Sequence, residues 1–214
     1  MIRILVFGMN PGIGGVQTYL MNLYRNIDRS KIQMDFIVPG NHCYYYDEIK
    51  ELGGQIFYIS PRKKNVIANI LDLARLFHRC RKSHKIVYFN LSILYYNIPF
   101  ILAKILRLSI VITHAHSTKS KTMKKDIRYY LHRINRIHVA HSSNYLLACS
   151  KLAGEWVFGR KTMNRGKVRI IPNAISIDKF TYIEDLRRRI RNKLGIKKEQ
   201  FVIGNVGRLS YESL

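Results

Sequence analysis

Two histidines separated by one residue are the side chains of this sequence best suited to acid–base or hydrogen-bonding chemistry. His114 and His116 lie in the segment 113–117, which follows a run of β-forming residues. A histidine there can act as a general base, or can hydrogen-bond a hydroxyl or phosphate group of a ligand. Metal binding would need a further ligand, and the sequence places none at a suitable spacing. The alternative is a pair of polar loop residues without a chemical role.

A glycine-rich turn close to the N-terminus is the second feature with possible chemistry. It follows a run of β-formers at 2–7, and an amphipathic helical pattern begins at Val16; the turn contains Gly8, Pro11, Gly12, Gly14 and Gly15. The helix starts without Ser, Thr, Asp or Asn, so its first N–H groups lack a side-chain cap. Together with the helix dipole, such groups attract an anion, most often a phosphate. The alternative is that the glycines only form a tight turn between strand and helix.

The turn matches neither of the common nucleotide-binding fingerprints. Gln17 stands where the third glycine of GxGxxG should be, and the pattern GxxxxGK[ST] is absent. The next strand, at about 33–38, ends in Pro39 and Gly40 without the acidic residue that would hold a ribose. The sequence therefore disfavours an NAD-dependent enzyme and a P-loop ATPase.

The scaffold that would position these residues is predicted to be a parallel sheet. Short β-forming runs alternate with helical patterns, and the predicted strands are 2–7, 33–38, 55–59, 85–90, 109–113, 146–149 and 168–171. Most of them are continuous apolar runs, which is typical of a parallel sheet covered on both faces. Right-handed crossovers then give a doubly wound, Rossmann-like α/β fold that binds ligands at the carboxyl ends of its strands. The glycine turn and the two histidines both follow strands at that edge.

The charge of the chain is strongly one-sided. Lys and Arg number 37 against 13 Asp and Glu, a formal net charge of +24. Such a surface attracts an anionic membrane or a nucleic acid. No RNP-like, KH-like or zinc-finger spacing supports nucleic-acid binding. The three scattered cysteines favour a reducing compartment over a disulfide framework.

A basic amphipathic helix is predicted over residues 119–138. Its apolar stripe consists of Met123, Ile127, Tyr130, Leu131, Ile134 and Ile137, and Lys and Arg residues surround the stripe. This pattern suits the surface of an anionic bilayer. A helix packed on the core, with a solvated basic face, would show the same stripe. The apolar run 91–112 is interrupted by Lys104 and Arg107 and is interpreted as a buried helix followed by a strand, not as a membrane span.

Four motifs occur along the chain in a characteristic order. They are Gly-Gly-Val-Gln at 14–17, His-Ala-His-Ser at 114–117, Ala-Cys-Ser-Lys at 148–151 with Trp-Val-Phe-Gly at 156–159, and Ile-Pro-Asn-Ala-Ile at 171–175 with Val-Gly-Arg-Leu at 206–209. In this series the chain resembles the N-terminal half of a GT-B glycosyltransferase of family 4 (GT4), which includes bacterial capsular and exopolysaccharide transferases. Relatives often have Glu at the position of Gln17, Gly at that of Ala174 and Asp at that of Ser176.

The resemblance implies transfer of a sugar from a nucleoside-diphosphate sugar, without a metal or another cofactor and usually with retention of configuration. Gly14 and Gly15 would face the donor diphosphate, and Arg208 would lie near the same group. His116 or His114 would form the catalytic centre by contacting the donor sugar or the acceptor, and His116 is preferred. The acceptor would be a lipid-linked saccharide or a polysaccharide. The protein would be cytoplasmic and peripheral on the anionic inner face of the plasma membrane.

The resemblance also implies a division of the chain. Residues 1–180 would form the acceptor-side domain, 181–200 an interdomain linker with a helix, and 201–214 the first strand and turn of a donor domain. With the donor site incomplete, the chain alone is expected to transfer little sugar, and another chain could supply the donor domain. The competing hypothesis, based on charge alone, is a non-catalytic basic module that binds anionic membranes or nucleic acid.

Overall fold

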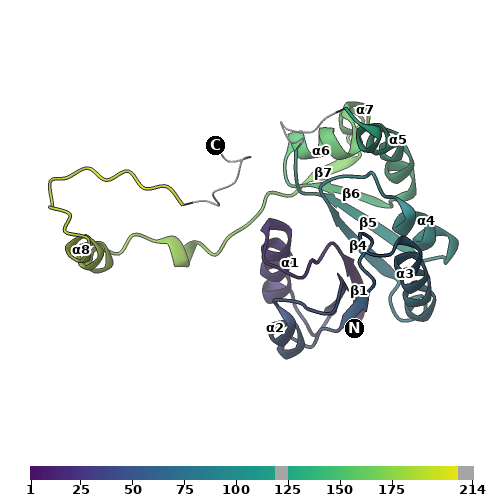
Figure 1. Cartoon of the computed structure of the whole chain (residues 1–214), viewed down its shortest axis with the longest axis horizontal. Helices are drawn as coiled ribbons and strands as arrows, with labels where there is room; N and C mark the ends of the chain where they lie inside the picture. The colour runs from purple at the N-terminus through teal and green to yellow at the C-terminus, as the bar shows by residue number, and fades with distance from the viewer. Residues whose placement is uncertain (119–124, 207–214) are drawn as a thin grey trace. The chain divides into compact units, whose positions relative to one another are not determined.

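The computed structural model of this protein describes residues 1–118 and 125–206 (Figure 1). The chain divides into two compact units, residues 1–173 and 174–214. The first unit contains the sheet and both predicted chemical features.

The first unit is built on a seven-stranded sheet with the order β3-β2-β1-β4-β5-β6-β7, and every neighbouring pair is parallel. The strands are β1 (Ile2–Phe7), β2 (Ile32–Pro39), β3 (Ile56–Ile59), β4 (Ile86–Leu91), β5 (Ile110–Ala115), β6 (Tyr145–Ala148) and β7 (Val168–Ile170). This confirms the predicted doubly wound, Rossmann-like α/β fold.

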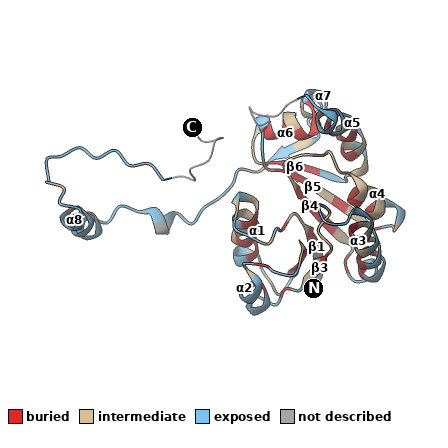
Figure 2. Ribbon diagram, in the orientation of Figure 1, coloured by how far each residue is buried: buried red, intermediate tan, exposed pale blue. Residues whose placement is uncertain are grey.

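Helices cover both faces of the sheet (Figure 1). The helices are α1 (Gly15–Asn26), α2 (Tyr46–Glu51), α3 (Val66–Cys80), α4 (Ile98–Ile105), α5 (Ile127–Ser142), α6 (Lys151–Phe158) and α7 (Arg160–Asn164). One core cluster joins α1 and α2 to the sheet, and a second joins α3 to α6 to the opposite face. Figure 2 shows the buried residues concentrated along the strands. Because the winding direction reverses between β1 and β4, the loops after these strands diverge and leave a site at their carboxyl ends.

The apolar run 91–112 forms α4 and the first half of β5, a helix followed by a strand as predicted, and Phe100 and Ala103 of α4 are buried. Within the described part of the chain, no helix has the length and apolarity needed to cross a membrane.

The second unit contains a 3₁₀ turn at Ile177–Phe180 and the helix α8 (Glu184–Lys193). The strand expected at the start of the segment 201–214 is not formed over 201–206: no described segment pairs with these residues, and Phe201 and Ile203 are 90% and 88% exposed. These residues have the apolar composition of a strand, but a strand also requires hydrogen-bonding partners for its backbone.

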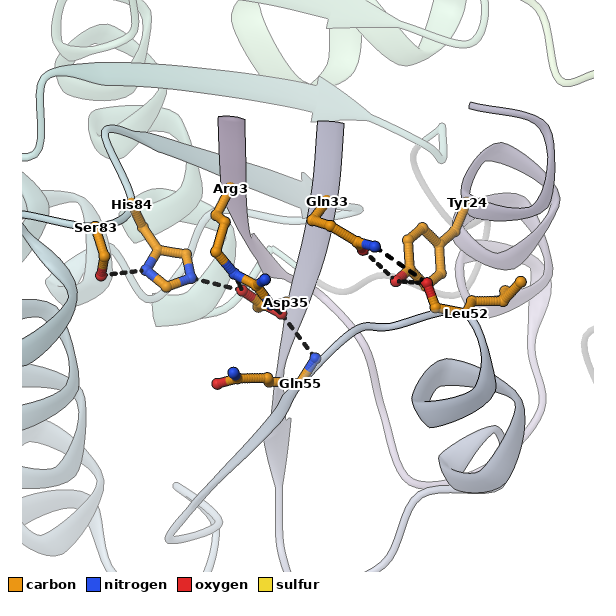
Figure 3. A network of polar contacts seen from close by, with 8 residues as sticks. All are labelled: Arg3, Tyr24, Gln33, Asp35, Leu52, Gln55, Ser83 and His84. Carbon is orange, nitrogen blue, oxygen red and sulfur yellow. Dashed lines mark hydrogen bonds and ion pairs between the residues drawn. The ribbon is translucent and has the colours of Figure 1, made fainter. Parts of the chain in front are cut away.

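A buried ionic network joins β1 and β2 to the segments that directly precede β3 and β4 (Figure 3). Asp35 of β2 is wholly buried and accepts two hydrogen bonds from Arg3 of β1, at 2.6 and 2.5 Å. It also accepts from the backbone N–H of Gln55 at 2.7 Å, and its Oδ2 lies 2.6 Å from Nε2 of His84, directly before β4. Nδ1 of His84 lies 2.9 Å from the Ser83 hydroxyl, so both ring nitrogens can donate and a charged imidazolium is satisfied.

The contribution of this network to stability depends on pH. Burial is the largest single influence and works to lower the pKa of His84, but the hydrogen bonds and charge interactions with Asp35 and Cys80 together outweigh it and raise the pKa from 6.5 to about 9. Burial works to raise the pKa of Asp35, yet the hydrogen bonds from His84 and Arg3 lower it below 3.8. The His84 contribution is therefore complete below its unfolded pKa of 6.5 and is lost as the pH rises through about 9. The Asp35 contribution is lost in acid, as the pH falls below 3.8.

At pH 6 we expect the native protein to have a larger free energy of unfolding than a His84→Gln variant. This difference between the two proteins should shrink by about 3 kcal/mol between pH 6 and about pH 9.5. Urea denaturation followed by circular dichroism across this range measures the difference. Titrations shared by both proteins cancel in the comparison. Parallel pH profiles for the two proteins would contradict the prediction.

Candidate active site

The turn after β1 presents an uncapped helix N-terminus, as the sequence predicted. Gly14 is the N-cap of α1 in an extended conformation (φ −168°, ψ 172°), no described side chain caps the helix, and its first turn has no acidic residue. A Cβ added at Gly15 would meet none of the described atoms within 4 Å, so the space beside the first helical residue is open. These are the features that attract a phosphate to a helix N-terminus.

Gln17 closes the inner side of the same turn. Its buried side chain donates from Nε2 to the Gly8 carbonyl at 3.1 Å. A Cβ on Gly14 would lie 2.6 Å from Oε1 of Gln17, so the glycine makes room for this contact. Gln17, which stands where GxGxxG would have its third glycine, therefore stabilises the conformation of the turn.

Close approach of β1 and β4 depends on Gly8. Its φ is +116°, and an added Cβ would lie 2.4 Å from the carbonyl oxygen and 2.8 Å from Cβ of Asn90. A side chain at this position would therefore be strained by its backbone conformation and would collide with β4. The glycine thus brings Asn90, at the carboxyl end of β4, against the glycine turn.

Asn90 determines which nitrogen of His116 carries the proton. The Asn90 amide nitrogen lies 3.3 Å from the carbonyl oxygens of Phe7 and Tyr88, so its amide oxygen is left to accept. That oxygen lies 2.9 Å from Nε2 of His116, which must then be the N–H donor. Burial lowers the pKa of His116 to about 4, so the ring is neutral near pH 7 and Nδ1 keeps its lone pair. His116 can accept a hydrogen bond or a proton from a hydroxyl group.

His114 is buried beneath His116. It has no exposed surface, and its Nδ1 lies 2.6 Å from the Tyr88 hydroxyl, which in turn lies 3.1 Å from the Tyr19 hydroxyl. Burial, and then the neighbouring His116, lower the pKa of His114 to about 3. The two imidazole rings are 4.1 Å apart between centroids, and Tyr19 lies against both at 5.1 and 4.8 Å. His114 therefore supports the position of His116 instead of facing solvent.

The structure brings most of the predicted site residues to one edge of the sheet. Tyr19 of α1 links the helix that begins at the glycine turn to His114 and His116 at the end of β5. Arg208 lies outside the described residues. The sequence did not single out the partners Tyr19, Tyr88 and Asn90. Asn90 and Tyr88 were detectable as polar atoms within an apolar strand, whereas Tyr19 looks like any aromatic residue of an amphipathic helix.

The fold is that of the N-terminal half of GT-B glycosyltransferases. A glycosyltransferase from Rickettsia africae ESF-5 superimposes with a TM-score of 0.64 at 14% identity, covering 92% of this chain and 50% of that one. MurG of Acinetobacter baumannii gives a TM-score of 0.52 at 9% identity, covering 82% of this chain and 46% of that one.

Sequence comparison identifies the family. The model of Glycosyltransferase Family 4 matches residues 13–179, and the chain belongs to this family. EpsF of Bacillus subtilis (strain 168), a protein described as a glycosyltransferase, is 32% identical over 210 residues, which are 94% of this chain and 52% of EpsF. The chain thus spans about half the length of this relative.

Proposed function

We propose that this chain is the acceptor-side half of a transferase that moves a sugar from a nucleoside-diphosphate sugar to a lipid-linked saccharide or polysaccharide in cell-surface polysaccharide synthesis. The observation that carries the proposal is a neutral His116, with its tautomer held by Asn90, at the same sheet edge as an uncapped helix N-terminus. Family membership supports glycosyl transfer as the reaction class.

In this proposal each site residue has a separate role. The N–H groups at Gly14 and Gly15 bind the donor diphosphate, helped by Arg208, and no metal or other cofactor takes part. His116 contacts the donor sugar or the acceptor and receives a hydrogen bond from a reacting hydroxyl. His114, which has no exposed surface, acts as a positioning residue through its ring contact with His116. The remainder of the donor site belongs to a C-terminal domain, carried by the same polypeptide or by another chain.

The experiment that tests the function uses the protein as its native cells make it. A tag at Met1 allows purification of whatever polypeptide carries this N-terminus, together with any chain bound to it. The preparation is incubated with native membranes and radiolabelled nucleoside-diphosphate sugars, and label is measured in the lipid extract and in the polysaccharide. Transfer with any of these donors supports the proposal, and absence of transfer with all of them contradicts it.

The basic helix α5 has an unexpected orientation. The residues that face the core are His132, Asn135 and Val139, whereas Ile134 and Ile137 of the apolar stripe are 66% and 67% exposed. His132 accepts from the Leu94 N–H at 3.0 Å and lies 3.1 Å from the Trp156 carbonyl. The interpretation of the stripe as a core-packed face is therefore wrong, because buried polar contacts hold the opposite face of the helix.

The outward stripe supports binding at a membrane surface. Ile127, Tyr130 and Leu131 are exposed together with Ile134 and Ile137. Beside α5 lies a groove of about 1000 Å³ whose lining includes apolar and cationic side chains; among them are Ile137, Leu152, Trp156, Arg133, Arg136, Arg160, Lys161 and Arg165. Apolar side chains flanked by cations suit an anionic bilayer interface. We accordingly place the protein in the cytoplasm, peripheral on the inner face of the plasma membrane. Residues 119–124, the basic start of the predicted helix, lie outside the described residues.

We expect a double Ile134→Glu, Ile137→Glu variant to bind anionic phosphatidylglycerol vesicles at least about tenfold more weakly, because it loses apolar insertion and adds repulsion. Vesicle sedimentation measures the partition coefficient. The matched control is Ile175→Glu in the second unit, a residue 63% exposed, which should leave binding almost unchanged. Equal binding by the double variant and the native protein would contradict the assignment of α5.

The competing basic-module hypothesis makes a different prediction in the same assay. Binding to RNA at physiological salt, with indifference to the α5 substitutions, would favour a nucleic-acid partner. Salt-sensitive binding to anionic vesicles but not to RNA favours the membrane. We propose that nucleic acid is not a partner.

A further inference from the structure

A cavity at the carboxyl edge of the sheet is lined by none of the residues assigned to the proposed reaction. It has a volume of about 440 Å³ and lies between the segments that end or follow β1, β2 and β3. Each of these segments contributes a proline to its wall, Pro11, Pro39 and Pro61. Proline has a fixed φ, so the wall is conformationally restricted before any ligand binds. The polar side chains of the lining are Asn10, Asn41, His42, Arg62 and Lys63, and no carboxylate of the described residues lines the cavity.

Arg62 is held in place by two tyrosines from the loop after β4. Its Cζ lies 4.6 Å from the ring centroid of Tyr95 and 4.7 Å from that of Tyr96. Its Nη2 donates to the Tyr95 hydroxyl at 2.7 Å. Tyr96 is fixed in turn, because its hydroxyl donates to Oδ1 of the buried Asn69 at 2.9 Å. The guanidinium is thus oriented by the loop that precedes α4, and Asn69 of α3 holds Tyr96 of that loop in place.

The charge of Arg62 has no counter-ion among the residues that the structure describes. Arg62 is half-buried, and the ion pairs of the described chain involve other side chains. Stacking on aromatic rings uses the face of a guanidinium and leaves the N–H groups on its edge available. Those groups match the geometry of a carboxylate or phosphate, which they bind through paired hydrogen bonds. Lys63, from the same loop, is exposed and adds a second positive charge to the cavity.

We propose that this cavity binds an anionic group, phosphate or carboxylate, of the saccharide acceptor. Arg62 and Lys63 bind the anion, and the side-chain amides of Asn10 and Asn41 hydrogen-bond sugar hydroxyls. Asn10 belongs to the same turn after β1 as Gly14, so a ligand in the cavity lies beside the turn that would bind the donor diphosphate. The identification of the ligand as the acceptor rests on the proposed function, whereas the anion site itself does not.

Calorimetric titration of the full chain with small anions tests the site without any donor. The probes are geranyl phosphate for a lipid-linked phosphate and glucuronate for an acidic sugar, with geraniol and glucose as their uncharged counterparts. We expect at least one anion to bind more tightly than its counterpart, and Arg62→Gln to weaken that binding about tenfold or more. Lys63→Gln, which alters an exposed side chain, should weaken it severalfold. The matched control is Arg81→Gln, which removes an equal charge from an exposed arginine at the end of α3.

The outcomes separate the alternatives. Binding of geranyl phosphate alone assigns the anion to a lipid phosphate, and binding of glucuronate alone assigns it to an acidic sugar. Binding of neither anion, or equal weakening by Arg62→Gln and Arg81→Gln, would overturn the proposal. Because no sugar is transferred in these titrations, their failure is distinguishable from failure of the transfer assay. Unchanged binding in Lys63→Gln, together with unfolding of Arg62→Gln, would also count against the site.

Discussion

Replacement of Asp35 by alanine is expected to lower the free energy of unfolding by about 3–5 kcal/mol, the cost typical of removing one partner from a buried ion pair. Asp35 is the acceptor at the centre of the network in Figure 3, and its carboxylate faces Arg3, His84 and the N–H of Gln55. Its removal leaves a buried cation, or a buried imidazole that must lose its proton, and an unpaired backbone donor. The contact that β1, β2 and the segments before β3 and β4 share is thereby lost.

Urea denaturation near pH 7, where Asp35 is ionised and the native His84 is charged, measures this loss. The matched control is Asp28→Asn, because Asp28 forms an exposed ion pair with Lys31 at 3.0 Å, and exposed ion pairs contribute little to stability. A double Asp35→Leu, His84→Phe variant should recover only part of the loss, because it removes the buried imidazolium but leaves the Arg3 guanidinium and the Gln55 N–H without their acceptor. A loss for Asp35→Ala no larger than that for Asp28→Asn would show that the network does not stabilise the fold.

The layout of the sheet was predictable because the determining signals are local. Alternation of apolar β-forming runs with helical patterns requires parallel strands, and handedness then leaves few topologies. The signal for the uncapped start of α1 was also local, since it depends only on which residues stand at 14 and 15. The same local reasoning failed at 201–206, where strand formation depends on a partner segment.

The orientation of α5 was ambiguous from the sequence for a physical reason. Hydrophobic periodicity locates the apolar face of a helix but does not say whether that face lies toward the core. In α5 the decision rests on Asn135, which donates to the Leu94 carbonyl at 2.7 Å, and on His132, which bonds two backbone groups. These contacts join segments distant in sequence. Buried polar residues with obligatory partners therefore outweigh the apolar pattern in orienting this helix.

The candidate site was predictable in location but not in its contacts. The motif at 114–117 points to two histidines but does not distinguish their roles. Only their hydrogen-bond partners distinguish them. His114 is bonded to Tyr88 within the core, whereas His116 is bonded to Asn90, which approaches β1 because residue 8 is glycine. The contacts arise where β1, β4 and β5 end together, so they depend on strand order. No spacing within a single segment encodes them.

His116→Gln is expected to lower kcat/KM for sugar transfer by about 10²-fold or more, the usual loss when a positioned proton acceptor is removed. Glutamine can still donate to the Asn90 oxygen that now lies 2.9 Å from Nε2, so the fold should be preserved. What it lacks is the basic nitrogen corresponding to Nδ1. The assay is the transfer reaction of the protein purified through its N-terminal tag, with His78→Ala, an exposed histidine of α3, as the matched control.

The pH profile gives this prediction a second readout that a purely structural role would not share. Because burial lowers the pKa of His116 to about 4, the neutral, accepting form dominates at all higher pH values. A histidine with the ordinary pKa of 6.5 would instead become protonated, and lose its lone pair, as the pH falls through that value. We therefore expect no loss of kcat/KM attributable to His116 between about pH 8 and pH 5, and a loss only as the pH approaches 4. A decline near pH 6.5 that disappears in His116→Gln would mean that His116 is more solvated than its contacts with Asn90, His114 and Tyr19 imply. Full activity of His116→Gln would show that the residue takes no part in the reaction.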